Sequence, residues 1–155
     1  MRLQILFILL IILNIESVYA QSLDENRVLT KIETLFNGMR SGDSAAVASV
    51  FLKNATMQSI SKDRDGNTRI NTGSLSAFKN SVATPHDQIW DERVANIKIN
   101  IDGDMAVAWV PYSFYSGEDF SHCGVNSFQF IKTDKGWKAL SIVDTRRNNN
   151  CIEDL

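Results

Sequence analysis

The chain has 155 residues, a formal net charge of −2 at pH 7 and two cysteines. This length is enough for one hydrophobic core. The near balance of charge offers no basic face of the kind that nucleic-acid-binding proteins carry, so nucleic acid is not an expected partner.

The N-terminus has the pattern of a secretory signal peptide. Arg2 supplies a short positive segment, residues 3–15 are largely apolar, and small residues lead up to a cleavage site near Ala20. The apolar run is shorter than the roughly 20 residues that span a bilayer. We therefore predict a signal peptide over residues 1–20 and export, to the periplasm or out of the cell, of one mature domain over residues 21–155 without a membrane span.

Helical spacing and strand alternation then predict the elements of the mature chain. They are helices over residues 23–42, 44–52 and 75–83, a strand over 55–63 that turns back at Asp65-Gly66, strands over 92–101 and 105–115, and a final hairpin over 121–143. Helices followed by a long antiparallel meander predict an α+β fold. In it, three N-terminal helices pack on one face of a strongly curved antiparallel sheet of about six strands.

The register of the final hairpin determines which side chains share a face. A three-residue loop ending at Gly136 would pair Thr133 with Trp137. The pairs that follow from this register are Phe128 with Ile142 and Phe130 with Leu140. Because apolar residues then meet apolar residues across the strands, the pattern supports this register.

Four polar or ionisable side chains share the apolar face in the same register. They are His122, Asn126, Asp144 and Arg146. Burying such groups is costly unless they are paired or face a solvated cavity. The sequence therefore predicts a pocket at this end of the concave face.

The element order and the ending "GWKALSIVDTRRNNNC" resemble the nuclear transport factor 2-like superfamily. The resemblance covers nearly all of residues 23–147 and is strongest to small exported bacterial members near the polyketide-cyclase and ketosteroid-isomerase branches. It implies a cone-shaped fold whose open end holds a ligand or an active site. The isomerase tyrosine of the first helix is missing, and "ATMQSIS" carries no carboxylate base. The resemblance therefore does not imply steroid isomerisation. His122 and Asp144 instead resemble the catalytic His and Asp residues of the family's dehydratases and cyclases.

The polar residues allow two interpretations. His122 could act as a general acid–base, with Asp144 orienting it or acting as the base itself. Alternatively, Asp144 pairs with Arg146 or Asn126 and only closes the rim of the cone. As ligand contacts, Arg146 would bind a carboxylate or phosphate and Asn126 a carbonyl group. Three aromatic residues are predicted as further ligand contacts, with the sheet core or a dimer contact as the alternative: Trp90, Trp109 and Tyr115.

We predict that the protein binds a small apolar or amphipathic molecule. One alternative is a cofactor-free dehydratase, isomerase or cyclase that uses His122 and Asp144. A second is a dimeric interaction domain, with a homodimer formed through the outer face of the sheet. The His and Cys spacings match no zinc motif, and the chain has no nucleotide loop or triad motif, so neither a metal nor a cofactor is expected.

Cys123 and Cys151 are predicted to form a disulfide, as an even pair in an exported chain favours. In the hairpin register Cys123 lies across from Arg147, on the face opposite His122. Residues 148–150 are asparagines, which turn readily because asparagine tolerates left-handed backbone angles. The bridge would hold the C-terminal tail over the start of the strand that carries His122.

Overall fold

The computed structural model describes the backbone of residues 2–151 and the side chains of residues 22–151. The predicted signal peptide, residues 1–20, lies outside the described side chains, and its cleavage stays a prediction. No helix within the described part is long and apolar enough to cross a membrane.

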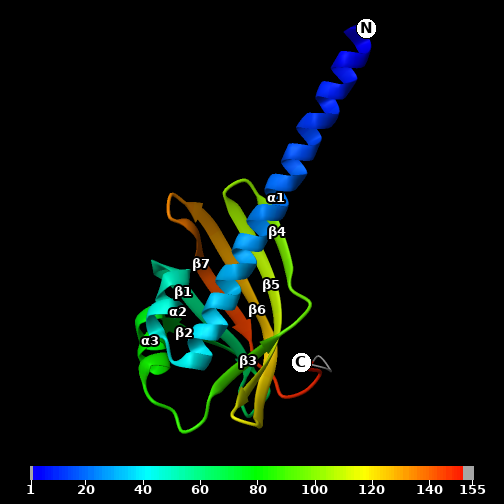
Figure 1. Ribbon diagram of the computed structural model, residues 1–155. Helices are drawn as coiled ribbons and strands as arrows, with labels where there is room; N and C mark the ends of the chain where they lie inside the picture. Colours follow the sequence, from blue (N-terminus) through cyan, green and yellow to red (C-terminus); the bar gives the residue numbers. More distant parts are fainter. Residues whose placement is uncertain (1, 152–155) are drawn as a thin grey trace.

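The described residues form three helices and one curved, seven-stranded sheet (Figure 1). The helices are α1 (Arg2–Ser41), α2 (Ser44–Val50) and α3 (Leu75–Ala83). The strands are β1 (Phe51–Lys62), β2 (Thr68–Ser74), β3 (Trp90–Val94), β4 (Lys98–Asp102), β5 (Met105–Ser116), β6 (Asp119–Thr133) and β7 (Gly136–Thr145). The predicted α+β class is confirmed, and the sheet has one strand more than the six expected.

The strand order is β2-β1-β7-β6-β5-β3, and β4 also pairs with β5. Every pair is antiparallel except β1 and β7, which run parallel. This parallel pair departs from the expected all-antiparallel sheet, because the first strand of the chain is placed beside the last. The arrangement puts β1 next to β7, the strand that carries Asp144.

The predicted strand over residues 92–101 is wrong in one respect, because the chain forms two strands there. Asn96 interrupts it with a φ of 55°, a left-handed angle that asparagine tolerates. Both strands pair with β5, one after the other along its length. The inward-facing phase shifts by one residue across the interruption, from Val94 on β3 to Ile99 on β4, because the chain is irregular at Asn96.

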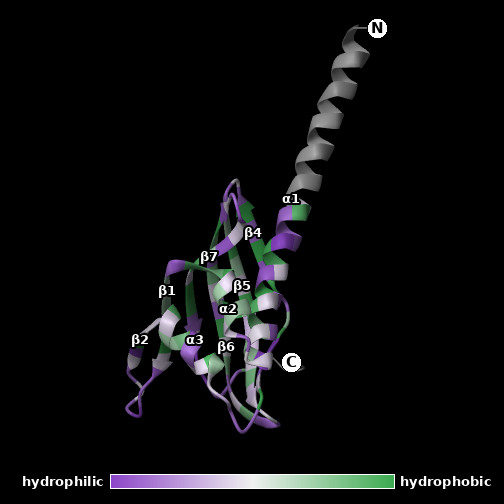
Figure 2. Cartoon of the chain, turned by 60° about the vertical axis from the view of Figure 1, so that its left-hand side comes forward, coloured by the Kyte–Doolittle hydropathy of each residue, from purple (hydrophilic) through white to green (hydrophobic). Residues whose placement is uncertain are grey.

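Helix α1 crosses the concave face of the sheet and buries an apolar stripe against it (Figure 1). Its buried residues recur at helical spacing: Val28, Ile32, Leu35, Phe36 and Met39. The sheet side of this core includes Ala106, Ala108, Val110, Phe128, Phe130 and Ala139. Figure 2 shows the contrast between the hydrophobic strands and the hydrophilic loop that joins β1 to β2.

A buried carboxylate anchors α1 at one end of the sheet. Asp24 accepts hydrogen bonds from Lys132 Nζ at 2.7 Å and from Trp137 Nε1 at 3.2 Å. The bond from Lys132, together with the one from Trp137, lowers the pKa of Asp24 to about 2. Trp137 is therefore a structural residue that ties the last strand to the helix.

The β6–β7 register follows the prediction only at the end that carries the polar residues. There Asn126 pairs with Asp144 and Phe128 with Ile142. This confirms that Asn126 and Asp144 share the concave face with the buried phenylalanine.

Nearer the turn the predicted pairs Thr133–Trp137 and Phe130–Leu140 are wrong. Thr133 pairs with Gly136 and Phe130 with Ala139, so the loop has two residues rather than three. A bulge after Ala139 then adds one residue to β7 and restores the predicted register. Leu140 lies at this bulge and is 41% exposed, not buried on the concave face.

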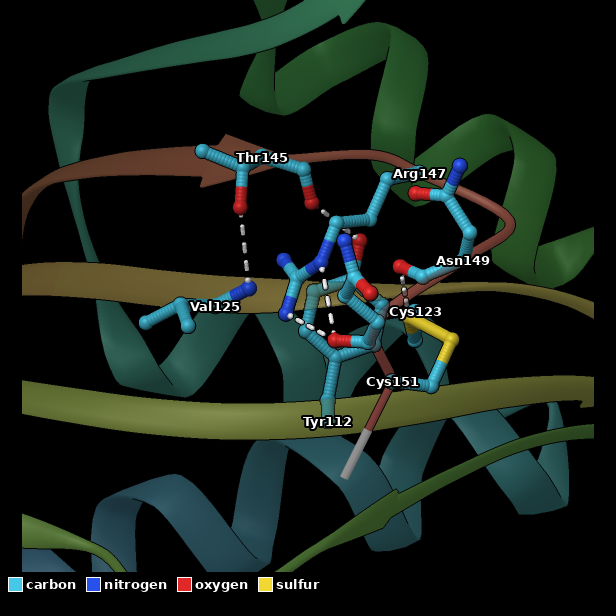
Figure 3. Close-up of a disulfide and its surroundings, with 8 residues drawn as sticks. Tyr112, Cys123, Val125, Thr145, Arg147, Asn149 and Cys151 are labelled. Atoms are coloured by element: carbon cyan, nitrogen blue, oxygen red, sulfur yellow. Dashed lines mark hydrogen bonds between the residues drawn. A yellow bond between two sulfur atoms is a disulfide. The ribbon is translucent and has the colours of Figure 1, made fainter. Parts of the chain in front are cut away.

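The predicted disulfide is present. Cys123 and Cys151 are bridged with a Cα–Cα distance of 5.7 Å (Figure 3). The backbones of Cys123 and Arg147 exchange hydrogen bonds of 2.8 and 2.9 Å, and the Arg147 guanidinium donates to the carbonyl of Asn150. The tail is thus fixed beside β6, on the face opposite the concave one.

Candidate functional site

A cavity of about 600 Å³ lies between α1, α3 and the concave face of the sheet. This volume suits a compact small molecule. Leu35, Phe36 and Phe78 line its apolar part. The polar residues at its other end include Ser59, Glu92, His122, Asn126, Asp144 and Arg146.

The cross-strand register explains why one end of the cavity is apolar and the other polar. Alternate residues of β6 face the helices, in the order Phe128, Asn126, Gly124 and His122. Their partners on β5 follow in the same order, as Ala108, Val110, Tyr112 and Phe114. The face therefore changes from apolar to polar within two residues of Phe128.

Asp144 is the centre of the polar group. It is buried, and its carboxylate accepts hydrogen bonds from Ser59 Oγ, from Tyr112 OH at 3.3 Å and from Arg146 Nε at 2.8 Å. Burial of the tyrosine and the nearby Asp144 charge raise the pKa of Tyr112, so its hydroxyl stays protonated and donates. These partners offset the cost of burying the Asp144 charge.

Glu92 is a second carboxyl group inside the cavity. Its Oε1 accepts a hydrogen bond of 2.6 Å from Asn126 Nδ2, and its Oε2 has no partner among the described residues. Burial, reinforced by the negative charge of Asp144, raises the pKa of Glu92 to about 7. Near neutral pH the cavity therefore contains a carboxylic acid that can donate a proton or a hydrogen bond.

The stability of the protein should reflect the proton on Glu92. Because its folded-state pKa lies above the ordinary 4.5, the folded protein retains a proton that the unfolded chain has released. The free energy of unfolding should fall, by at most about 3 kcal/mol, as the pH rises from about 4.5 to about 7. Glu92→Gln should remove this decline. Urea unfolding of both proteins across this pH range tests it, and parallel stability curves would contradict the assignment.

His122 lies across from Phe114 at the polar end. Its ring is tilted against Phe114 at 5.1 Å and edge-on to Tyr112 at 5.7 Å, while Nδ1 lies 3.0 Å from Ser121 Oγ. Burial and the charge of Arg146 lower the pKa of His122. His122 and Asp144 line the same cavity, but no hydrogen bond joins them in the described structure.

Of the three aromatic residues predicted to contact a ligand, one lines the cavity and two do not. Trp90 lines the cavity and stacks on His86 at 3.8 Å. Trp109 does not line it: the side chain lies on the opposite face of β5, and the residue is 51% exposed. Tyr115 does not line it either, and its ring lies 4.0 Å below the Arg93 guanidinium. The aromatic residues of β5 that do face the cavity are Tyr112 and Phe114.

Sequence reasoning missed Glu92, Tyr112 and Ser59. A signal for Glu92 was present, because it alternates in phase with Trp90 and Val94 on β3. A charged residue on the apolar phase of a strand is the same pattern that identified Asn126 and Asp144. For Tyr112 the phase depended on the register of β5, which the sequence left open.

The β6–β7 ladder opens at Val125 and Thr145, one residue beyond the Asn126–Asp144 pair (Figure 3). The amide of Val125 donates to Thr145 Oγ1 at 3.1 Å, and the Thr145 carbonyl instead accepts from Tyr112 OH at 3.0 Å. A Cβ atom on Gly124 would overlap the Thr145 carbonyl and lie 2.9 Å from Cε1 of Tyr112. Only glycine fits at this position, and the tyrosine that it admits also holds Asp144.

No group of three or more His, Cys, Asp and Glu residues within the described part of the chain could hold a metal ion. The donors that could instead contact an organic ligand are the free Oε2 of Glu92, Asn126 and the side chains of His122 and Arg146.

A family model described as "Putative lumazine-binding" matches residues 23–143. A search of curated protein sequences finds no match to the chain. Among solved structures, an NTF2-like protein with a cystatin-like fold from Novosphingobium aromaticivorans is similar, with a TM-score of 0.71, 13% identity and coverage of 88% of this chain and 90% of that one. An NTF2-like protein from Shewanella baltica gives a TM-score of 0.62, 16% identity and coverage of 84% and 98%. A "putative dehydratase from the NTF2-like family" from Streptomyces avermitilis gives a TM-score of 0.62 and 16% identity, with coverage of 82% of this chain and 98% of that one.

Proposed function

This chain belongs to the "Putative lumazine-binding" family and to the NTF2-like superfamily, and on that premise we propose that it binds a compact, planar, amphipathic molecule in the cavity described above. The single observation that carries the proposal is the hydrogen-bonded Glu92–Asn126 pair, with Glu92 Oε2 free for a ligand, inside an aromatic-walled cavity.

The cavity walls favour a flat ring. Trp90 and Phe114 lie edge to face at 6.1 Å, and His122 continues the row of rings beyond Phe114. Aromatic faces contact a planar ligand over a large area with little loss of side-chain freedom. The apolar residues of α1 and α3 exclude water from the other side.

The polar floor favours a ring that carries adjacent donor and acceptor groups. Glu92 in its acid form can donate from Oε2, and the side-chain carbonyl of Asn126 can accept, since it has no partner in the described structure. A ring carbonyl next to a ring N–H matches this pair. Lumazine is a planar bicyclic heterocycle with such groups, and the family description names it. We therefore select lumazine as the probe.

Calorimetric titration with lumazine tests the proposal. The protein should bind it saturably with one site, and Gly73→Phe should weaken binding at least about tenfold, equivalent to about 1.4 kcal/mol. Gly73 lines the cavity, with ordinary van der Waals space around the position of a Cβ, so a phenylalanine ring there would occupy the ligand volume.

Thr72→Phe is the matched control, because Thr72 points to the other face of β2. It should leave lumazine binding unchanged. Equal effects of the two variants, or no saturable binding by the unmodified protein, would rule the proposal out.

A second candidate function is cofactor-free acid–base catalysis. The notion of a His122–Asp144 pair is weakened by the missing contact between them, but Glu92 supplies an acid next to the carboxylate of Asp144. Asp144 would remove a proton from carbon while Glu92 gives its proton to a carbonyl oxygen. The structural likeness to a "putative dehydratase" supports this candidate. Turnover of carbonyl substrates that Glu92→Gln does not reduce would exclude it.

Two further features belong to the proposal. Export is supported by the disulfide, since such bridges persist in oxidising compartments. A homodimer through the outer sheet face is supported by exposed Met105, Trp109, Ile131 and Leu140. The N-terminal residue of the exported protein and its sedimentation velocity test the two features separately.

A further inference from the structure

A second set of hydrogen-bond donors lies at the polar end of the cavity, apart from the Glu92–Asn126 floor. His122 on β6 and Arg146 beyond the end of β7 both line it. His122 engages Ser121 through Nδ1, and Nε2 has no partner in the described structure. Arg146 gives only Nε to Asp144, so neither terminal nitrogen of its guanidinium has a partner there.

The strand register places these two side chains at the same end of the cavity. Cys123 pairs with Arg147 and Asn126 with Asp144, so Gly124 lies opposite Arg146. The Thr145 carbonyl and the Tyr112 ring fill the space where a Gly124 side chain would lie, and the His122 ring is edge-on to Tyr112 at 5.7 Å. Besides burial, the charge of Arg146 lowers the pKa of His122, so this charge still reaches the histidine. Asp144 fixes the guanidinium through Nε and leaves the fork of the two terminal nitrogens free, and such a fork matches carboxylate and phosphate oxygens.

We propose that His122 Nε2 and the terminal nitrogens of Arg146 form a subsite for an anionic substituent, a carboxylate or phosphate, on the molecule that the cavity binds. The inference rests on the proposed function, because the apolar and aromatic part of the cavity would hold the rest of that molecule. The natural ligand would then carry a carboxylate or phosphate group, which lumazine lacks, so lumazine would occupy only the part of the cavity that holds the ring.

The charges around the subsite fit an anion. Asp144 is already engaged by Arg146, Ser59 and Tyr112, so it does not oppose the ligand as a free charge. Glu92 on β3 is the remaining acidic group of the cavity, and it is uncharged in its acid form. Binding of an anion should strengthen as the pH falls, because His122 gains a proton and Glu92 keeps one.

Three probes of similar size test the charge requirement: phenyl phosphate, benzoate and uncharged benzyl alcohol. Calorimetry should show that at least one of the two anions binds about tenfold more tightly than the alcohol. The two anions distinguish a phosphate from a carboxylate site. In nuclear magnetic resonance titrations, the bound anion should raise the pKa of His122, a readout that requires no variant.

Arg146→Gln should abolish the preference for anions, whereas Arg147→Gln should keep it, because Arg147 bonds the tail at Asn150. Arg146→Lys keeps the charge, and so part of the preference, if the glutamine variant fails to fold. Equal binding of the charged and uncharged probes, with the His122 titration unmoved, overturns the inference. If that occurs while lumazine still binds, the proposed function stands alone. If anions bind and lumazine does not, the subsite stands and the choice of heterocycle fails.

Discussion

Replacing Cys151 with serine is expected to lower the free energy of unfolding by about 3 to 4 kcal/mol, a large part of the stability of a domain of this size. The bridge joins residues 28 positions apart and so restricts the unfolded chain. It also pins the tail to Cys123, whose neighbour His122 lines the cavity. Urea unfolding of the oxidised protein and of Cys151→Ser measures the loss.

The oxidised protein treated with a reductant is the control for this substitution. It should lose as much stability as Cys151→Ser, and the reductant should leave the variant unchanged. Thiol titration of the denatured, unreduced protein should find no free thiol. Two free thiols, or a stability loss below about 1 kcal/mol, would contradict the predicted role of the bridge.

Gly124→Ala is expected to cost more than about 4 kcal/mol or to prevent folding. The added Cβ would overlap the carbonyl oxygen of Thr145 and crowd the Tyr112 ring. Neither neighbour can move freely, because Thr145 is backbone of β7 and Tyr112 is bonded to that carbonyl and to Asp144. Circular dichroism and urea unfolding measure the effect.

Two substitutions separate this overlap from a general effect of losing a glycine. Gly73→Ala should change stability by less than about 1 kcal/mol, because the nearest atom to its Cβ is 3.8 Å away. Tyr112→Phe removes only the hydroxyl and should cost about 1–3 kcal/mol through the unpaired carbonyl of Thr145. A stable, fully folded Gly124→Ala protein would show that β6 and β7 can separate locally. It would contradict the claim that the close approach of Gly124 to the Thr145 carbonyl requires glycine.

Local patterns were sufficient for the parts of the fold that depend on alternation and turn chemistry. Pairing of the apolar residues Phe128 and Ile142 across the hairpin placed Asn126 opposite Asp144. The same register brought the C-terminal tail close enough to Cys123 to predict its bridge to Cys151. These inferences held because the relevant contacts lie within one hairpin and its extension.

Contacts between distant parts of the chain could not be read from such patterns. The parallel pairing of β1 with β7 brings Ser59 to Asp144, and no local signal specifies it. The bulge after Ala139 changes the number of residues in β7 without changing its alternation near Asp144. Glu92 was missed because β3 pairs with β5 and not with β6, so no strand register links Glu92 to its partner Asn126.

The most direct test of the account is a crystal structure of the protein with lumazine at a concentration that saturates binding in solution. We expect the heterocycle inside the cavity of about 600 Å³, with a ring carbonyl within hydrogen-bonding distance of Glu92 Oε2 and a ring N–H directed toward the side-chain carbonyl of Asn126. Lumazine bound elsewhere, on the outer face of the sheet for example, or an empty cavity under these conditions would contradict it.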